Sequence, residues 1–226
     1  MATEFGRVRQ NSYEDYSEGQ DRLARLNRRG ELVVTNFFDQ IIMDGRGFHM
    51  QIGTEDAPVN TTTSIDDQLA WGVVDNTVGY AMIPLLFEVV FDMVDTAVNL
   101  DIMLEWDKDK VRYTSGGTAY VPANMRGDDP RAAVGTFVVG TDVTVAAKSA
   151  VPNTVELARR APIEDVVTDP TTGKLGWDPV IYSCKSRPIV IGIDACSYVL
   201  HAGAGTADAN AYGVFQFAQL PKESVV

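Results

Sequence analysis

The sequence contains only two histidines, His49 and His201, and they lie far apart in the chain. A transition-metal site in a β-sandwich enzyme is usually built from several histidines and a carboxylate, and this chain cannot supply that set. We therefore expect neither histidine to bind a metal, and we predict no obligatory cofactor. Calcium at Asp66-Asp67 or Asp128-Asp129 stays an alternative, because calcium needs only oxygen ligands.

Cysteine is equally scarce. Cys184 and Cys196 both lie in apolar, strand-like runs, and the eleven residues between them fit neither a zinc knuckle nor a thioredoxin motif. A disulfide would form only if their strands lay side by side. We favour the alternative, in which both are buried free thiols that pack as small apolar side chains.

Long apolar runs and basic residues are also few. No run approaches the roughly 18 apolar residues of a membrane-spanning helix, and the first residues lack the apolar centre of a secretory signal. We predict no membrane span and synthesis in the cytoplasm. The chain has 19 Lys plus Arg against 31 Asp plus Glu, a net charge of −12 that repels phosphate backbones. Extensive nucleic-acid binding by the body of the protein is therefore excluded.

Two signatures of catalysis are missing as well. The chain has no GxSxG motif, whose serine sits on a turn between a strand and a helix. The small-residue segments at Gly116-Gly117 and 202–211 lack the Lys-Ser/Thr of a phosphate-binding loop, so their glycines fit tight turns better. We predict that the protein is not an enzyme.

What the sequence does contain is a two-residue period. Residues 80–106 contain two strand patterns. In each pattern, apolar side chains at every second position alternate with a second set of side chains, which includes most of the acidic residues of this stretch. The apolar positions are Leu85, Phe87, Val89, Phe91 and Met93 in the first pattern, and Leu100, Ile102, Leu104 and Trp106 in the second. Because side chains alternate along a strand, we expect a hairpin with one face in the core. The acidic positions, such as Glu88 and Glu105, are expected to form its solvated face.

Further strand patterns occur on both sides of this stretch. They cover 31–38, 48–52, 132–148, 179–186, 187–200 and 212–221, with turn residues between them. The one convincing helical pattern is 154–167, within a stretch at 149–177 that we interpret as an insertion between strands. Eight to ten strands of this kind predict an all-β fold, an antiparallel two-sheet sandwich over 31–226. Its first and last strands are expected to pair, as they do in a jelly roll.

Residues 1–30 differ from the rest, because they are polar and crowd basic residues at their end. We interpret them as an N-terminal arm, which either is a mobile terminus or orders against a neighbouring subunit. The arm also allows at most a weak contact with nucleic acid. Its candidates for subunit contacts are Arg22, Arg25, Arg28, Arg29, Leu23 and Leu26.

Several stretches together resemble a known class of protein. They are RGELVVTNFFDQIIMDGRGFHMQIGT, AMIPLLFEVVFDMVD, TAYVPANMRGDDPRA and PIVIGIDACSYVLHAGAGTADANAYGVFQFAQLP. Their strand order, the turn region at Asn124-Met125-Arg126 and the small-residue loop before the last strand are similar to single jelly-roll capsid proteins of bacteriophages and related viruses. The resemblance implies a self-assembling shell subunit of a virion. Its partners would be copies of itself and other virion proteins.

Two other classes of function remain open at this level. A virion-surface or lectin-like module that recognises a glycan or a receptor would need exposed aromatic residues along a groove. Trp71, Trp106, Trp177 and Tyr198 are the candidates, although each fits a core or interface position better. A secreted-type jelly-roll enzyme is disfavoured by the small number of histidines and by the missing signal segment.

Overall fold

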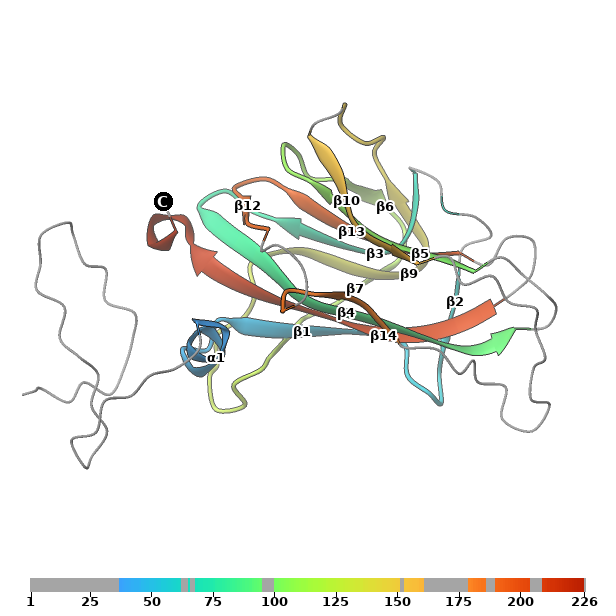
Figure 1. Ribbon diagram of the computed structural model, residues 1–226, viewed down its shortest axis with the longest axis horizontal. Helices are drawn as coiled ribbons and strands as arrows, with labels where there is room; N and C mark the ends of the chain where they lie inside the picture. Colours follow the sequence, from blue (N-terminus) through green and yellow to red (C-terminus); the bar gives the residue numbers. More distant parts are fainter. Residues whose placement is uncertain are drawn as a thin grey trace, which may run out of the picture.

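The computed structural model describes residues 37–61, 65, 68–94, 100–150, 153–160, 179–185, 190–203 and 209–225. These residues form two antiparallel β-sheets that pack face to face (Figure 1). The fold is therefore all-β and two-layered, as predicted. Among the described residues, no helix has both the length and the apolar character needed to cross a membrane.

Each sheet has seven strands, and neighbouring strands alternate in direction. The first sheet has the order β11 (Val180–Ser183), β4 (Tyr80–Val94), β14 (Ala209–Pro221), β1 (Gly47–Ile52) and β8 (Ala123–Asn124), with β12 (Gly192–Ile193) beside β4 and β2 (Val59–Asn60) beside β14. The second has the order β10 (Thr154–Arg160), β5 (Asp101–Asp107), β13 (Ser197–Gly203), β3 (Leu69–Asn76), β9 (Gly135–Val145) and β6 (Tyr113–Ser115), with β7 (Thr118–Ala119) beside β9.

The eight strands β1, β3, β4, β5, β10, β11, β13 and β14 pair in a nested order. The first pairs with the last, since β1 lies beside β14 over the whole of its length. Moving inward along the chain, β3 pairs with β13, β4 with β11, and β5 with β10. The first described strand thus pairs with the last, as expected for the ends of the domain, but it is 47–52 and not the strand predicted at 31–38.

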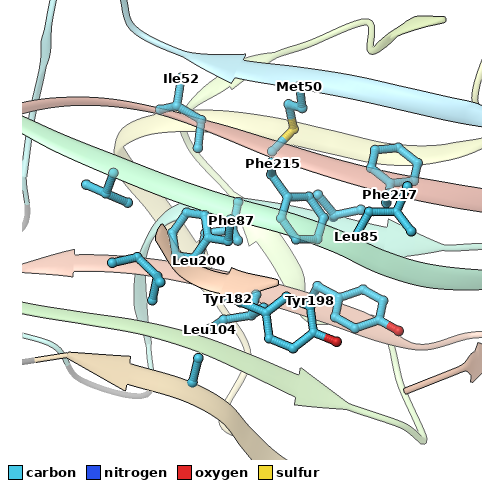
Figure 2. Packing of buried hydrophobic residues seen from close by; sticks show 14 of the residues in the cluster. Met50, Ile52, Leu85, Phe87, Leu104, Tyr182, Tyr198, Leu200, Phe215 and Phe217 are labelled. Atoms are coloured by element: carbon cyan, nitrogen blue, oxygen red, sulfur yellow. The ribbon is translucent and has the colours of Figure 1, made fainter. Parts of the chain in front are cut away.

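The core lies between the sheets and is built by the alternation seen in the sequence. Met50, Phe87 and Phe215 reach it from the first sheet, and Leu104 and Leu200 reach it from the second (Figure 2). All five side chains are fully buried. At roughly 25 cal/mol per Å² of apolar surface removed from water, this layer is the main source of the stability of the domain.

The expected hairpin at 80–106 is wrong, because its two strands belong to different sheets. β4 pairs with β14 and β11, whereas β5 pairs with β13 and β10. Their apolar faces meet across the core instead of lying side by side. A two-residue period identifies the face of a strand that is buried, but it says nothing about which strand lies at its edge.

Two further predictions about local structure are wrong. Residues 154–160 of the predicted helix form β10, and the remaining residues of that pattern lie outside the described part of the chain. Conversely, the last two residues of the strand predicted at 31–38 belong to the helix α1 (Phe37–Met43), and residues 31–36 lie outside the described part of the chain. Phe38 and Ile41 have the three-residue spacing of one helix face, and both pack against the core. Gly45, with a φ of 69°, follows the helix and turns the chain into β1.

The cysteines are free thiols, as favoured above, and both are buried. Cys184 follows β11 of the first sheet, and Cys196 precedes β13 of the second. Burial raises the pKa of the Cys196 thiol to about 12. Such a thiol is protonated at neutral pH and is a poor nucleophile.

Candidate functional site

Three acidic residues of the second sheet are buried on the side that faces away from the core. Asp75 on β3 and Glu105 on β5 are 3% exposed, and Asp107 is fully buried. Their neighbours Val74 and Leu104 point into the core, so these carboxylates point outward. The expectation that the acidic face of 100–106 is solvated is therefore wrong.

Two chain segments cover this outer face, and we call residues 108–113 and 145–149 the cover. The Ala146 amide donates to the Arg112 carbonyl oxygen at 2.7 Å, and the Lys110 Nζ donates to the Ala147 carbonyl oxygen at 2.5 Å. The two segments are thus tied to each other, and they lie over the outer face of β3, β13 and β5. We call that outer face the covered face.

The carboxylates hold the cover down. Asp75 accepts hydrogen bonds from the backbone amides of Arg112 and Tyr113, at 3.1 and 3.0 Å. Asp107 accepts one from the backbone amide of Ser149 at 2.9 Å. The two carboxylates thus provide hydrogen-bond acceptors for the backbone of the cover.

Glu105 binds the one arginine that is fully buried among the described residues. The Arg112 guanidinium forms an ion pair with Glu105 Oε2, and its Nε donates to the Ala146 carbonyl oxygen at 2.9 Å. Lys148 Nζ lies 3.7 Å from Glu105 Oε1, and His201 Nε2 lies 3.7 Å from Glu105 Oε2. Burial alone would raise the pKa of Glu105, but the interactions with His201 and Arg112 outweigh it and lower the pKa to about 2.

Ser197, His201 and the carboxylates share this face, but their arrangement does not suit nucleophilic catalysis. Ser197 and His201 are four residues apart on β13, which separates them by about 13 Å along the strand. A serine nucleophile needs its base within hydrogen-bonding distance. The two histidines cannot share a metal either, because His49 lies on the outer face of the first sheet. Among the described residues, no group of three metal-binding side chains occurs.

Apolar side chains complete the closure of the covered face. They form a second, smaller core outside the sheet, separate from the one between the sheets, and Tyr113 of β6 packs against it. Its members are Ala70, Val73, Val138, Val143, Val145 and Val199. The central strands of the second sheet, β3, β13 and β5, are therefore buried on both of their faces. All seven residues of β13 are buried, as expected for a strand enclosed in this way.

The outer face of the first sheet is different. Alternate residues of β4, β14 and β1 point away from the core and stay partly exposed to solvent. We call these eight residues the open face: Leu86, Glu88, Val90, Tyr212, Val214, Gln216, His49 and Gln51. Glu88 is the one carboxylate in this set. In a chain of net charge −12, the open face is poor in charge.

The turn region around Asn124 is a third place where charged side chains gather. Asp128 pairs with Arg126, whose Nε lies 2.7 Å from its Oδ1, and Asp129 pairs with Arg131 at 2.6 Å. The guanidinium groups hold the pKa of both carboxyls below its usual range. Both carboxylates therefore already have cationic partners, which weakens the case for calcium here. Asp66-Asp67 lies outside the described residues.

The aromatic candidates for a binding groove are placed in the core. Trp71 and Tyr198 are fully buried, and Trp106 is partly buried and stacks on Tyr198 with ring centroids 6.4 Å apart. Trp177 lies outside the described part of the chain. The expectation that these residues suit a core better than a binding surface is confirmed for Trp71 and Tyr198.

The six candidates for subunit contacts, Arg22, Arg25, Arg28, Arg29, Leu23 and Leu26, lie outside the described residues, so their role stays a prediction.

Sequence reasoning missed Asp75, Asp107 and Arg112. One signal was available for Asp75, because it follows a run, 70–74, that has no polar residue on either face. Such a run is typical of a strand that is covered on both sides.

Comparisons with protein-family models, curated proteins and solved structures found no match.

Proposed function

We propose that this protein is a structural subunit that self-assembles, of the kind that forms the shell of a virion. One observation carries the proposal: the second sheet is sealed on its outer side by its own chain, whereas the first sheet presents a charge-poor outer face with apolar side chains in contact with solvent. A sealed face needs no partner. A regular, charge-poor sheet face suits contact with another surface that is regular and repeats.

The order of strand pairing supports a jelly-roll form of the sandwich. In a jelly roll, eight strands fold as one long hairpin. The first strand pairs with the eighth, the second with the seventh, the third with the sixth and the fourth with the fifth. The pairs β1–β14, β3–β13, β4–β11 and β5–β10 follow this order. The elements from β6 to β9 would then be an addition between the fourth and fifth strands. Jelly rolls form viral capsids but also lectin domains, so this fold supports the shell hypothesis without selecting it.

The covered face supports a rigid building block. Three buried carboxylates fix the cover by bonds to its backbone and to Arg112, and apolar side chains fill the space beneath. A subunit that tiles by symmetry must present the same surface in every copy, and close packing provides that. Within this proposal the partners are copies of the chain and other virion proteins, and the location is the virion.

The test is the native mass of the purified full-length chain. Light scattering and negative-stain imaging of the same fractions, over a range of protein and salt concentrations, should show regular assemblies or defined oligomers. High salt should favour them, because it screens repulsion between chains of charge −12. A monomer of 24.6 kDa at every concentration and salt would contradict the proposal. Binding of a glycan by that monomer would then favour the alternative, a binding module.

A further inference from the structure

The carboxylate of the open face and the polar side chains of β1 lie on opposite sides of its central strand, β14. Glu88 on β4 and Gln51 on β1 are both register partners of Val214 on β14, and His49 lies two residues from Gln51. We propose that the open face binds the same face of a second copy of the chain, about a two-fold axis that runs along β14. This inference rests on the proposed self-assembly and specifies one of its contacts.

We choose this axis because it places a hydrogen-bond donor of the second copy opposite Glu88, the one carboxylate of the open face. Rotation about β14 places β4 of one copy above β1 of the other. Glu88 of each copy then faces Gln51 of the other, with His49 beside it. Packed sheets lie about 10 Å apart, a distance that two such side chains span together. The contact is isologous, so the pairing occurs twice.

An axis across the strands would be less favourable. It would place β4 over β4 and bring Glu88 towards the same residue of the second copy. Like charges that face each other in a contact oppose association. The axis along β14 avoids this repulsion and gives each carboxylate an amide donor.

Net charge is the reason for choosing a second copy as the occupant. Two chains of charge −12 repel each other, so they can approach only through surfaces that carry few charges. The open face has one carboxylate among eight described side chains, and Val214 and Tyr212 supply apolar contact area. Eight outward residues on three strands cover on the order of 260 Å² in projection. A stable complex buries about 800 Å² per partner, so this contact is weak alone and gains strength by repetition in an assembly.

The first experiment places a charge at the centre of the contact. In the full-length chain, Val214→Lys puts two lysines near the axis, and we expect self-association to weaken by about 100-fold in sedimentation equilibrium. Val155→Lys is the matched control, because Val155 is 38% exposed on β10 of the other sheet. It adds the same charge away from the open face and should leave self-association unchanged.

The second experiment tests the axis. Gln51→Glu would face Glu88 of the other copy with a second carboxylate, and we expect association to weaken about 10-fold. Adding Glu88→Lys to that variant should restore it, because each new carboxylate then faces a lysine. Failure of the double variant to recover, after the single one has weakened, would overturn the proposed axis.

The outcomes separate this contact from self-assembly itself. If the wild-type chain assembles and Val214→Lys assembles equally well, the open face is not the contact, while the proposed function stands. If the wild-type chain is always a monomer, both proposals are wrong. In a dilute monomer, a Val214→Cys variant should react rapidly with a maleimide. Slow labelling would mean that another part of the chain occupies the face, and it would overturn the contact between copies.

Discussion

The two sheets of this sandwich treat their outer faces in opposite ways. On the second sheet, residues 108–113 and 145–149 cross the outside, and buried carboxylates and valines hold them there. On the first sheet, the outward side chains of β4, β14 and β1 remain partly exposed. Both faces come from strands with the same alternation, so the difference lies in what the chain does after each strand ends. Polar residues on the outer face of the second sheet bind the segments that cross it, whereas those on the outer face of the first sheet stay partly exposed and can contact a partner.

The largest expected effect is on the covered face. Arg112→Ala leaves Glu105 buried without its guanidinium partner, and an unpaired buried charge typically costs about 3–5 kcal/mol of unfolding free energy. Urea denaturation of the purified variant measures this loss. Arg126→Ala, which breaks the exposed pair with Asp128, is the matched control and should cost far less, because solvent screens such a pair. Equal losses in the two variants would show that the buried ion pair does not hold the cover.

The next effect is a dependence of stability on pH. The pKa of Glu105 is lowered to about 2 from an ordinary 4.5, so its contribution is complete above pH 4.5 and is lost as the pH falls towards 2. A shift of this size corresponds to about 3 kcal/mol. Burial raises the pKa of Asp75, which acts in the opposite direction, because protonation in acid relieves its cost.

Glu105→Gln isolates the contribution of Glu105. The difference in unfolding free energy between the wild-type chain and this variant should shrink as the pH falls from about 4.5 to 2, as followed by urea denaturation at each pH. Asp75 is common to both chains, so its opposite trend cancels in that difference. A difference that stays constant over this range would contradict the assignment.

Much of the fold could be predicted from alternation, and the covered face shows where that method ends. The inward residues of β4 and β5, such as Phe87 and Leu104, were identified because apolar side chains recur every two residues. The same pattern placed Glu105 on the opposite face correctly. It failed on burial, because a period of two distinguishes the faces of a strand but does not reveal a distant segment that covers one of them.

The pairing of strands was predicted only at the ends of the domain. The first and last strands were expected to lie together, but 31–38 was taken as the first strand instead of β1, and β4 and β5 were assigned to one hairpin. Their register depends on partners far away in the chain, such as β14 for β4, whose paired residues are more than a hundred positions apart. Sequence spacing contains no information on such contacts. It therefore could not show that the cover lies on the second sheet or that the outer face of the first sheet stays partly exposed.

A third prediction concerns the edge strand beside β9, where glycine is required for two reasons. Gly117 has a φ of 67°, and a Cβ there would lie 2.6 Å from methyl groups of both Val138 and Val143. We expect Gly117→Ala to cost about 3 kcal/mol, from overpacking and from backbone strain. Gly79→Ala is the control, because its φ of 89° brings the strain while no atom lies within 4 Å.

That control should cost about 1 kcal/mol, and the difference between the two variants measures how tightly the small core of the covered face is packed. Thermal unfolding of both variants is a sufficient measurement. If Gly117→Ala costs no more than Gly79→Ala, the valines beneath the cover have room to move, and the covered face is less rigid than the proposed building block requires.

The smallest effect compares one substitution on the two outer faces. Val73 on the covered face is fully buried among the valines of the second core, so Val73→Ala removes two methyl groups and leaves a cavity. We expect a loss of about 2 kcal/mol of unfolding free energy. Val214 on the open face is partly exposed in the monomer, and Val214→Ala should cost less than about 1 kcal/mol there. Urea denaturation at a concentration where the chain is monomeric gives both values.

The same comparison can be repeated at increasing protein concentration. If copies pack through the open face, the cost of Val214→Ala should rise with concentration, because only the associated state buries this side chain. The cost of Val73→Ala should stay constant. A cost at Val214 that does not depend on concentration would mean that the open face remains solvated in every state of the protein.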